Sequence, residues 1–138
     1  MNRPERKLYL GALVLFTAGF AGAVGYRAGS AQQPGVQRNE LLRVDEPGST
    51  THEAIMLVVQ FAPGAAVPRH RHPGLELGYL LEGSVILEHE GRPAQTLKPG
   101  DSFSNSGAHA ARNAGAGPAK LLVVYLVEKG KPPAEPLP

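Results

Sequence analysis

Short apolar runs separated by turn residues make up most of the chain after residue 40. Runs that are rich in branched side chains and bounded by Gly, Pro and Asp are typical of β-strands. We expect strands at 40–44, 53–61, 77–81, 84–89, 95–97 and 119–128, with two further extended stretches around His70 and at 109–113. The run 53–61 is apolar enough for burial on both faces, and Glu82-Gly83 resembles the loop of a two-residue hairpin.

Turn-forming residues set the fold class. The chain has 17 Gly and 13 Pro among 138 residues, and no helical periodicity is convincing after residue 40. This pattern predicts an all-β fold with a single antiparallel sandwich or barrel domain. We place that domain at 40–130, after a polar linker at 32–39 and before a proline-rich tail at 131–138 that forms an extended arm.

The first 31 residues have a different character. A basic start with Arg3, Arg6 and Lys7 precedes the uncharged stretch 8–25, which we expect to be a hydrophobic helix. One interpretation is a secretory signal that is cleaved after Ala31. The other is an uncleaved membrane anchor through residues 8–25. Both predict an exported domain, either periplasmic or secreted, or anchored in the cytoplasmic membrane and facing outward.

Charge and cysteine content exclude several function classes. Residues 1–31 carry a net charge of +3, which leaves −1 for residues 32–138. The basic isoelectric point therefore belongs to the leader, and no basic stripe with aromatic residues remains, so we expect no nucleic-acid partner. The chain has no cysteine, which excludes a thiolate nucleophile and a thiolate-bound metal.

A cluster of metal-binding residue types lies in the middle of the chain. His70 and His72 are two positions apart, so an extended backbone points both imidazoles to one face. The bend at Pro73-Gly74 lets Glu76 return to that face, and His109 offers a fourth ligand from a second extended stretch. Three imidazoles and a carboxylate suit a divalent transition metal such as Fe, Mn, Ni, Cu or Co, and Zn fits the same ligand types.

Two motifs carry a resemblance to a known family. The spacing of Gly64, His70, His72, Glu76 and Gly83 resembles the first cupin motif at every position. His109, three residues and Asn113 resemble the end of the second cupin motif, which Gly100-Asp101 precedes. This second motif departs from the family, because 104–108 reads SNSGA where cupins usually have Pro and Gly, and the run from Gly100 to His109 is short.

The resemblance covers roughly residues 40–130 and implies a small jelly-roll β-barrel with one copy of each motif. It therefore implies a single-domain cupin. In this family dimerisation through edge strands is common, so we expect a homodimer.

The predicted surroundings of the metal narrow its chemistry. By alternation the interior near the site is lined by His70, His72, Glu76, Gly78, Leu80, His109 and Ala111. Apart from the ligands this pocket is apolar and uncharged, with no inward Lys, Tyr or second carboxylate, so acid–base isomerisation has little support. The pattern favours a dioxygenase-like oxidoreductase acting on a small organic substrate.

Two alternatives remain open: a non-catalytic small-ligand binding or sensing module of the cell envelope, and a structural or metal-buffering envelope protein.

Other notable residues have ordinary interpretations. We expect His52 and His89 to be surface or hydrogen-bonded histidines. The glycines Gly64, Gly83, Gly91 and Gly100 are expected to supply turn dihedrals. Asn113 lies on the face of His109, where it either supports the site by a hydrogen bond or caps the turn at Ala114-Gly115.

Overall fold

Ten β-strands make up residues 33–138, the part of the chain that the computed structural model describes. They are β1 (Val36–Asp45), β2 (His52–Phe61), β3 (Ala66–Arg71), β4 (Gly74–Glu82), β5 (Val85–His89), β6 (Gln95–Leu97), β7 (Ser102–Asn105), β8 (His109–Asn113), β9 (Ala119–Glu128) and β10 (Glu135–Pro136). This range contains no helix, and so none able to cross a membrane. The signal or anchor predicted at 1–31 lies outside the described residues.

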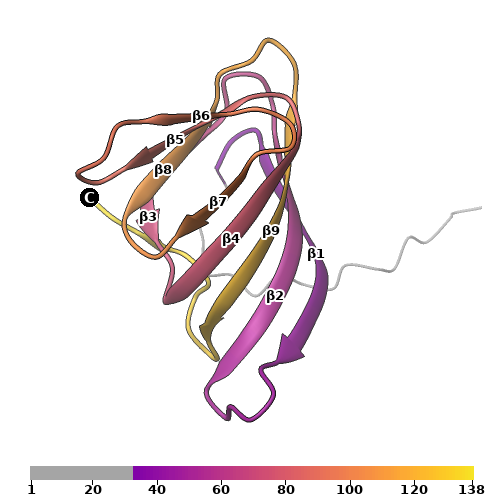
Figure 1. Cartoon of the computed structure of the whole chain (residues 1–138), viewed down its shortest axis with the longest axis vertical. Coiled ribbons are helices and arrows are strands. Elements are labelled where there is room, and N and C mark those ends of the chain that lie inside the picture. The colour runs from indigo at the N-terminus through magenta and orange to yellow at the C-terminus, as the bar shows by residue number, and fades with distance from the viewer. Residues whose placement is uncertain (1–32) are drawn as a thin grey trace, which may run out of the picture.

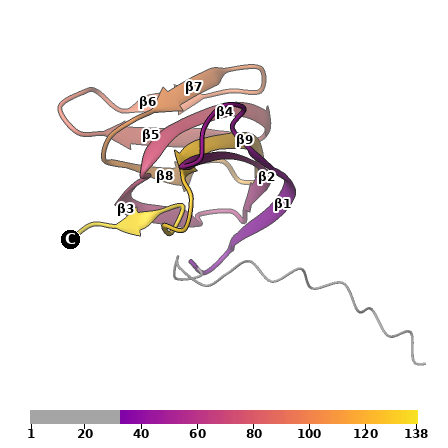
Figure 2. The same cartoon turned by 90° about the horizontal axis from the view of Figure 1, so that it is seen from below.

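The strands form two antiparallel sheets that enclose one interior. Sheet A has the order β1-β2-β9-β4-β7, and sheet B has the order β10-β3-β8-β5-β6. In Figure 1, β5, β6 and β8 of sheet B lie on the left, and β1, β2 and β9 of sheet A lie on the right. Figure 2 shows the same strands curving around the interior when seen from below. The predicted all-β antiparallel barrel is confirmed.

Alternation of side chains along the long strands builds the core. In β2 and β9 every second side chain is buried, as Leu57 and Val123 illustrate. Burial of a leucine of this kind contributes about 1.5–3 kcal/mol. The expected burial of 53–61 on both faces is wrong, because Met56 and Val58 on the outer face of β2 remain half-exposed. Their face belongs to an antiparallel sheet with one solvated side.

The predicted hairpin at Glu82-Gly83 is also wrong. β4 pairs with β7 and β9 in sheet A, whereas β5 pairs with β6 and β8 in sheet B. The turn is a corner at which the chain passes from one sheet to the other. Gly83 has φ of 83°, and a Cβ there would lie 2.5 Å from the carbonyl oxygen of Pro118, so the corner requires glycine.

Both ends of the domain are more ordered than predicted. β1 begins at Val36, so residues 36–39, expected as part of the linker, pair with β2. The tail, predicted to be an extended arm, returns to the barrel, where β10 pairs with β3. An ion pair of 2.9 Å between Arg71 and Glu135 adds to this contact. The tail therefore covers the end of the barrel where the histidines lie.

Candidate metal centre

A bulge in β3 sets the direction of the first histidine. Val67 pairs with Ala111 and His70 pairs with His109, so β3 advances by three residues where β8 advances by two. Pro68 lies in this bulge, where its missing N–H does not interrupt a regular ladder. The additional residue places His70 on the interior face that Val67 occupies.

The connection from β3 to β4 brings in the next two side chains. His72 lies directly after β3 and is buried, and the bend at Pro73 leads into β4. A Cβ at Gly74 would collide with the carbonyl oxygen of Leu126, so β4 begins with glycine. Glu76 then faces the interior and is 6% exposed. Its position confirms the predicted return to the histidine face.

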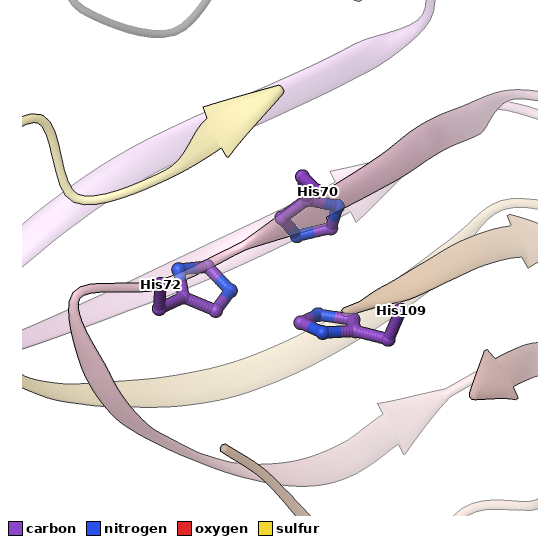
Figure 3. A group of neighbouring side chains, drawn as sticks. All are labelled: His70, His72 and His109. Atoms are coloured by element: carbon purple, nitrogen blue, oxygen red, sulfur yellow. The ribbon is translucent and has the colours of Figure 1, made fainter. Parts of the chain in front are cut away.

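The three histidines and the glutamate meet inside the barrel. His109, at the start of β8, is 3% exposed and lies opposite His70. Figure 3 shows the rings of His70, His72 and His109 pointing toward one another, and their ligand atoms lie within 4.8 Å of one another. Glu76 Oε2 lies 3.0 Å from His109 Nε2 and 3.4 Å from His72 Nε2.

Backbone carbonyls determine which ring nitrogen faces the centre. The Nδ1 atoms of His70, His72 and His109 lie 2.9, 2.5 and 2.9 Å from the carbonyl oxygens of Pro68, Pro133 and Gly107. Because a carbonyl oxygen only accepts, each Nδ1 carries the proton and donates. Each neutral ring then turns the lone pair of Nε2 inward.

The centre consequently gathers groups that accept hydrogen bonds. Three Nε2 lone pairs and a carboxylate face one point, and the buried Nε2 of His72 has no hydrogen-bond partner among residues 33–138. Acceptors that face one another in a buried site require a cation between them, either a proton or a metal. These donor types at these separations fit a transition-metal ion, so His70, His72 and His109 could together coordinate one.

The same contacts shift the acidity of the cluster. Burial lowers the pKa of His70 to about 4, and the nearby charge of His109 contributes to this. Burial raises the pKa of Glu76, but the close contacts with His109 and His72 outweigh it, so the pKa of Glu76 is well below its usual value. Burial lowers the pKa of His109, but the hydrogen bond to Glu76 outweighs it and raises the pKa of His109. His109 therefore holds a proton next to Glu76 to a higher pH than an ordinary histidine would.

Two residues that support the centre were not recognised from the sequence. Glu76 pairs across sheet A with Tyr125 of β9 and Asn105 of β7. Asn105 Nδ2 donates to Glu76 Oε2 at 2.6 Å, and Tyr125 stacks on His72 with ring centroids 4.4 Å apart. The expectation of no inward tyrosine is therefore wrong. The sequence could have predicted this position of Tyr125, because residues two apart in a strand point to the same face and Tyr125 lies two positions after the apolar Val123.

The cavity beside the centre is small. The sequence predicts an uncharged wall apart from the ligands, and this prediction is wrong. The volume of the cavity is about 30 Å³, which is room for roughly one water molecule. Apolar side chains form most of its wall, but Arg38 of β1 also reaches it. Phe103 fills the space over Gly78, where a Cβ would collide with the aromatic ring. Ala111 lines the cavity as predicted.

The remaining sequence candidates have structural roles. Asn113 donates to the carbonyl oxygens of Phe61, Ala62 and Gly117 and accepts from the Gly115 N–H, so the turn-capping interpretation is confirmed. His52 lies 3.0 Å from the Thr51 hydroxyl at an exposed strand end. His89 pairs with His109 across sheet B, with ring centroids 6.2 Å apart, and stays outside the histidine cluster.

The four turn glycines all have positive φ, as predicted: Gly64 72°, Gly83 83°, Gly91 70° and Gly100 98°.

Comparison with known proteins agrees with this geometry. The family model described as "Cupin domain" matches residues 57–125, a range that runs from the core of β2 to Tyr125 and contains all four converging side chains. The chain belongs to the cupin family. Comparison of this cupin with curated proteins finds no match.

Several solved structures share the fold. A cupin-like protein from Thermotoga maritima msb8 is 27% identical, with 74% of this chain and 75% of that chain covered and a TM-score of 0.57. The DMSP lyase DddQ from Ruegeria pomeroyi DSS-3 is 27% identical, with 72% and 50% covered and a TM-score of 0.56. A recombinant oxalate oxidase in complex with glycolate is 24% identical, with 77% and 58% covered and a TM-score of 0.58. This cupin thus spans about half the length of the lyase.

Proposed function

We propose that His70, His72, Glu76 and His109 bind a divalent transition metal, and that the protein is a metal-dependent, dioxygenase-like oxidoreductase acting on a small organic substrate. The observation that carries the proposal is the set of acceptor atoms aimed at one buried point. Without a cation, three imidazole lone pairs and a carboxylate would repel one another there.

The separations suit an octahedral ion. At bond lengths of about 2.1 Å, adjacent ligand atoms lie about 3.0 Å apart, close to the 3.0 Å and 3.4 Å found between Glu76 and the two histidines. With these four residues as ligands, a bound ion would keep positions open for substrate or water and would supply an electrophilic centre there. Mixed nitrogen and oxygen ligands suit Fe, Mn, Ni, Cu or Co, and Zn accepts the same set.

The chain's own residues prepare these positions. Asn105 orients the Glu76 carboxylate, and the carbonyls behind the rings hold each Nε2 inward. The largely apolar wall around the cavity suits a small apolar or aromatic compound.

A non-catalytic ligand-binding or sensing module is the second candidate function. The observation that favours it is the size of the inner cavity, about 30 Å³, which admits about one water molecule rather than an organic substrate. In that case the metal would hold the fold, and a ligand would bind outside the inner cavity.

The first experiment tests the metal. Protein purified without added metal is analysed for bound elements, alongside the double variant His70→Ala/His72→Ala and the control His52→Ala, which removes a half-buried histidine outside the cluster. We expect about one divalent ion per chain in the natural protein and the control, and loss of that ion in the double variant. Unchanged metal in the double variant would refute the site.

The second experiment tests the reaction. Oxygen consumption by the Fe(II)-loaded protein is followed with a panel of phenolic and diketone compounds, and the double variant serves as the blank. Substrate-dependent consumption supports the oxidoreductase. A compound that raises the melting temperature without being transformed supports the binding module instead.

We also propose that the domain is exported, on the basic start and the uncharged stretch 8–25. The mass of the N-terminus distinguishes a cleaved signal, with a mature chain beginning at Gln32, from an intact anchor.

A further inference from the structure

A second, larger pocket lies between β1, β3 and the C-terminal tail. Its volume is about 310 Å³, at the lower end of the range of roughly 300–1,000 Å³ that holds small ligands. Pro34, Pro68, Pro136 and Leu137 contribute apolar wall. The pocket shares Arg38, Val67 and His70 with the inner cavity, so a ligand bound here would lie beside the metal centre.

Arg38 is the charged group where the two cavities meet. It is half-buried on β1 and pairs across the sheet with the core residue Val59. Within residues 33–138 its guanidinium makes no ion pair and no side-chain hydrogen bond, whereas the other arginines of the strands do, namely Arg43, Arg69, Arg71 and Arg112. A partly desolvated guanidinium without a partner is poised to bind an anion, and its planar fork matches a carboxylate.

Gln33 supplies a second unsatisfied group in the same pocket. Its Oε1 is buried and has no hydrogen-bond partner in the described part of the chain. Three neutral imidazoles and one carboxylate leave a divalent ion with a net charge of about +1, which adds to the positive potential from Arg38. The pocket therefore combines apolar walls with positive charge at Arg38 and one free acceptor oxygen at Gln33, which suits a donor group on the body of a ligand.

We propose that this pocket binds a small organic carboxylate, with its carboxylate on the Arg38 guanidinium and its apolar body against the proline-rich wall. The carboxylate of the ligand then lies at the wall that the pocket shares with the inner cavity, beside His70. This assignment of the substrate class rests on the proposed function for the role of the metal, but the binding of the carboxylate itself does not require it.

The test compares two probes of the same shape and different charge. Binding of benzoate and of benzamide to the full-length, metal-loaded protein is measured by calorimetry, and metal content is measured on the same samples. We expect benzoate to bind about 10-fold more tightly than benzamide, because only benzoate pairs with Arg38. Arg38→Gln should abolish this preference and keep the metal. The control is Arg112→Gln, which changes an exposed arginine paired with Glu88 and should leave the preference for benzoate unchanged.

A second variant tests the location. Ala134→Trp places a bulky side chain in the pocket from the tail, and we expect it to weaken binding of both probes while Arg38 is intact. Equal affinity for the two probes in the natural protein, or a preference for benzoate that persists in Arg38→Gln, would overturn the proposal. Metal without carboxylate preference contradicts this pocket and leaves the proposed metal centre standing. A preference for the carboxylate in protein that holds no metal supports this pocket and contradicts the proposed metal centre.

Discussion

The histidines of this cupin owe their orientation to the backbone rather than to other side chains. Each Nδ1 donates to a main-chain carbonyl, at Pro68, Pro133 or Gly107. Such an outer contact fixes the tautomer and raises the basicity of the inward nitrogen. Asn105 has the same role for the carboxylate of Glu76. The ligand set is thus preorganised before any ion binds.

Metal affinity should depend on pH through the proton that the metal displaces. Burial lowers the pKa of His109, but Glu76 outweighs it, so a proton on His109 is held more tightly than on an ordinary histidine, and metal binding must release that proton. Affinity should therefore fall as pH falls through the pKa of His109, about tenfold per pH unit for one released proton. His70, with its pKa lowered to about 4, adds a second competing proton only in more acidic solution.

Competition titrations with Co(II) between about pH 5 and 8, the range in which histidines titrate, measure this slope. A dissociation constant that stays constant across the range would contradict a tightly held proton at His109.

Two local features of the strands assemble the centre. The bulge at Pro68 rotates His70 and His72 into the barrel, since regular pairing from Val67 onward would turn Arg69 inward instead. The C-terminal tail returns to β3 through β10, which places the Pro133 carbonyl against His72. A short terminal segment thereby becomes part of the support for the metal.

Removing residues 131–138 should weaken metal binding about 10- to 100-fold, the usual cost of losing a partner behind a metal-binding histidine. The barrel itself should still fold, because β10 contributes only two residues at the edge of sheet B. The control is removal of residues 137–138, which keeps both β10 and Pro133. Metal titration measures the affinity of the two truncated proteins for the ion. Equal affinities would exclude a role for the tail in metal binding.

The outer face of sheet A is unusually apolar for a surface. Leu42, Met56, Val124 and Leu77 pair in one row across four strands. By register and alternation, the exposed apolar residues of this face are Leu42, Val44, Leu77, Tyr79 and Leu126. A continuous apolar face of this kind marks an interaction surface. We propose that a second copy of the chain covers it, which gives the expected homodimer a contact through the sheet face.

Leu42→Lys/Leu77→Lys should then weaken dimerisation by about tenfold or more, because an unpaired lysine would be buried in an apolar contact. Ile86→Lys, on the half-exposed outer face of β5, is the matched control. Sedimentation velocity in mild detergent, which removes association through residues 8–25, measures the monomer–dimer equilibrium. Dimers that tolerate the double substitution would exclude this face.

Local patterns in the sequence were sufficient for the fold class and for three of the four converging residues. Alternation of apolar side chains predicts strands, and His70, His72 and Glu76 lie so close in the chain that a strand and one bend bring them together. His109 required the resemblance in addition, because its partner strand lies far away in the sequence. These inferences succeed because they depend on spacing over a few residues.

Only the tertiary structure decided what depends on pairing between distant strands. The corner at Gly83, the pairing of Glu76 with Asn105 and Tyr125, and the position of Arg38 at the shared wall of two cavities all follow from register and sheet order. Strand period is a property of each segment, but register is set by the packing of the whole barrel. The converging residues of the centre could therefore be identified from the sequence. The contacts that support them could be identified only from the structure.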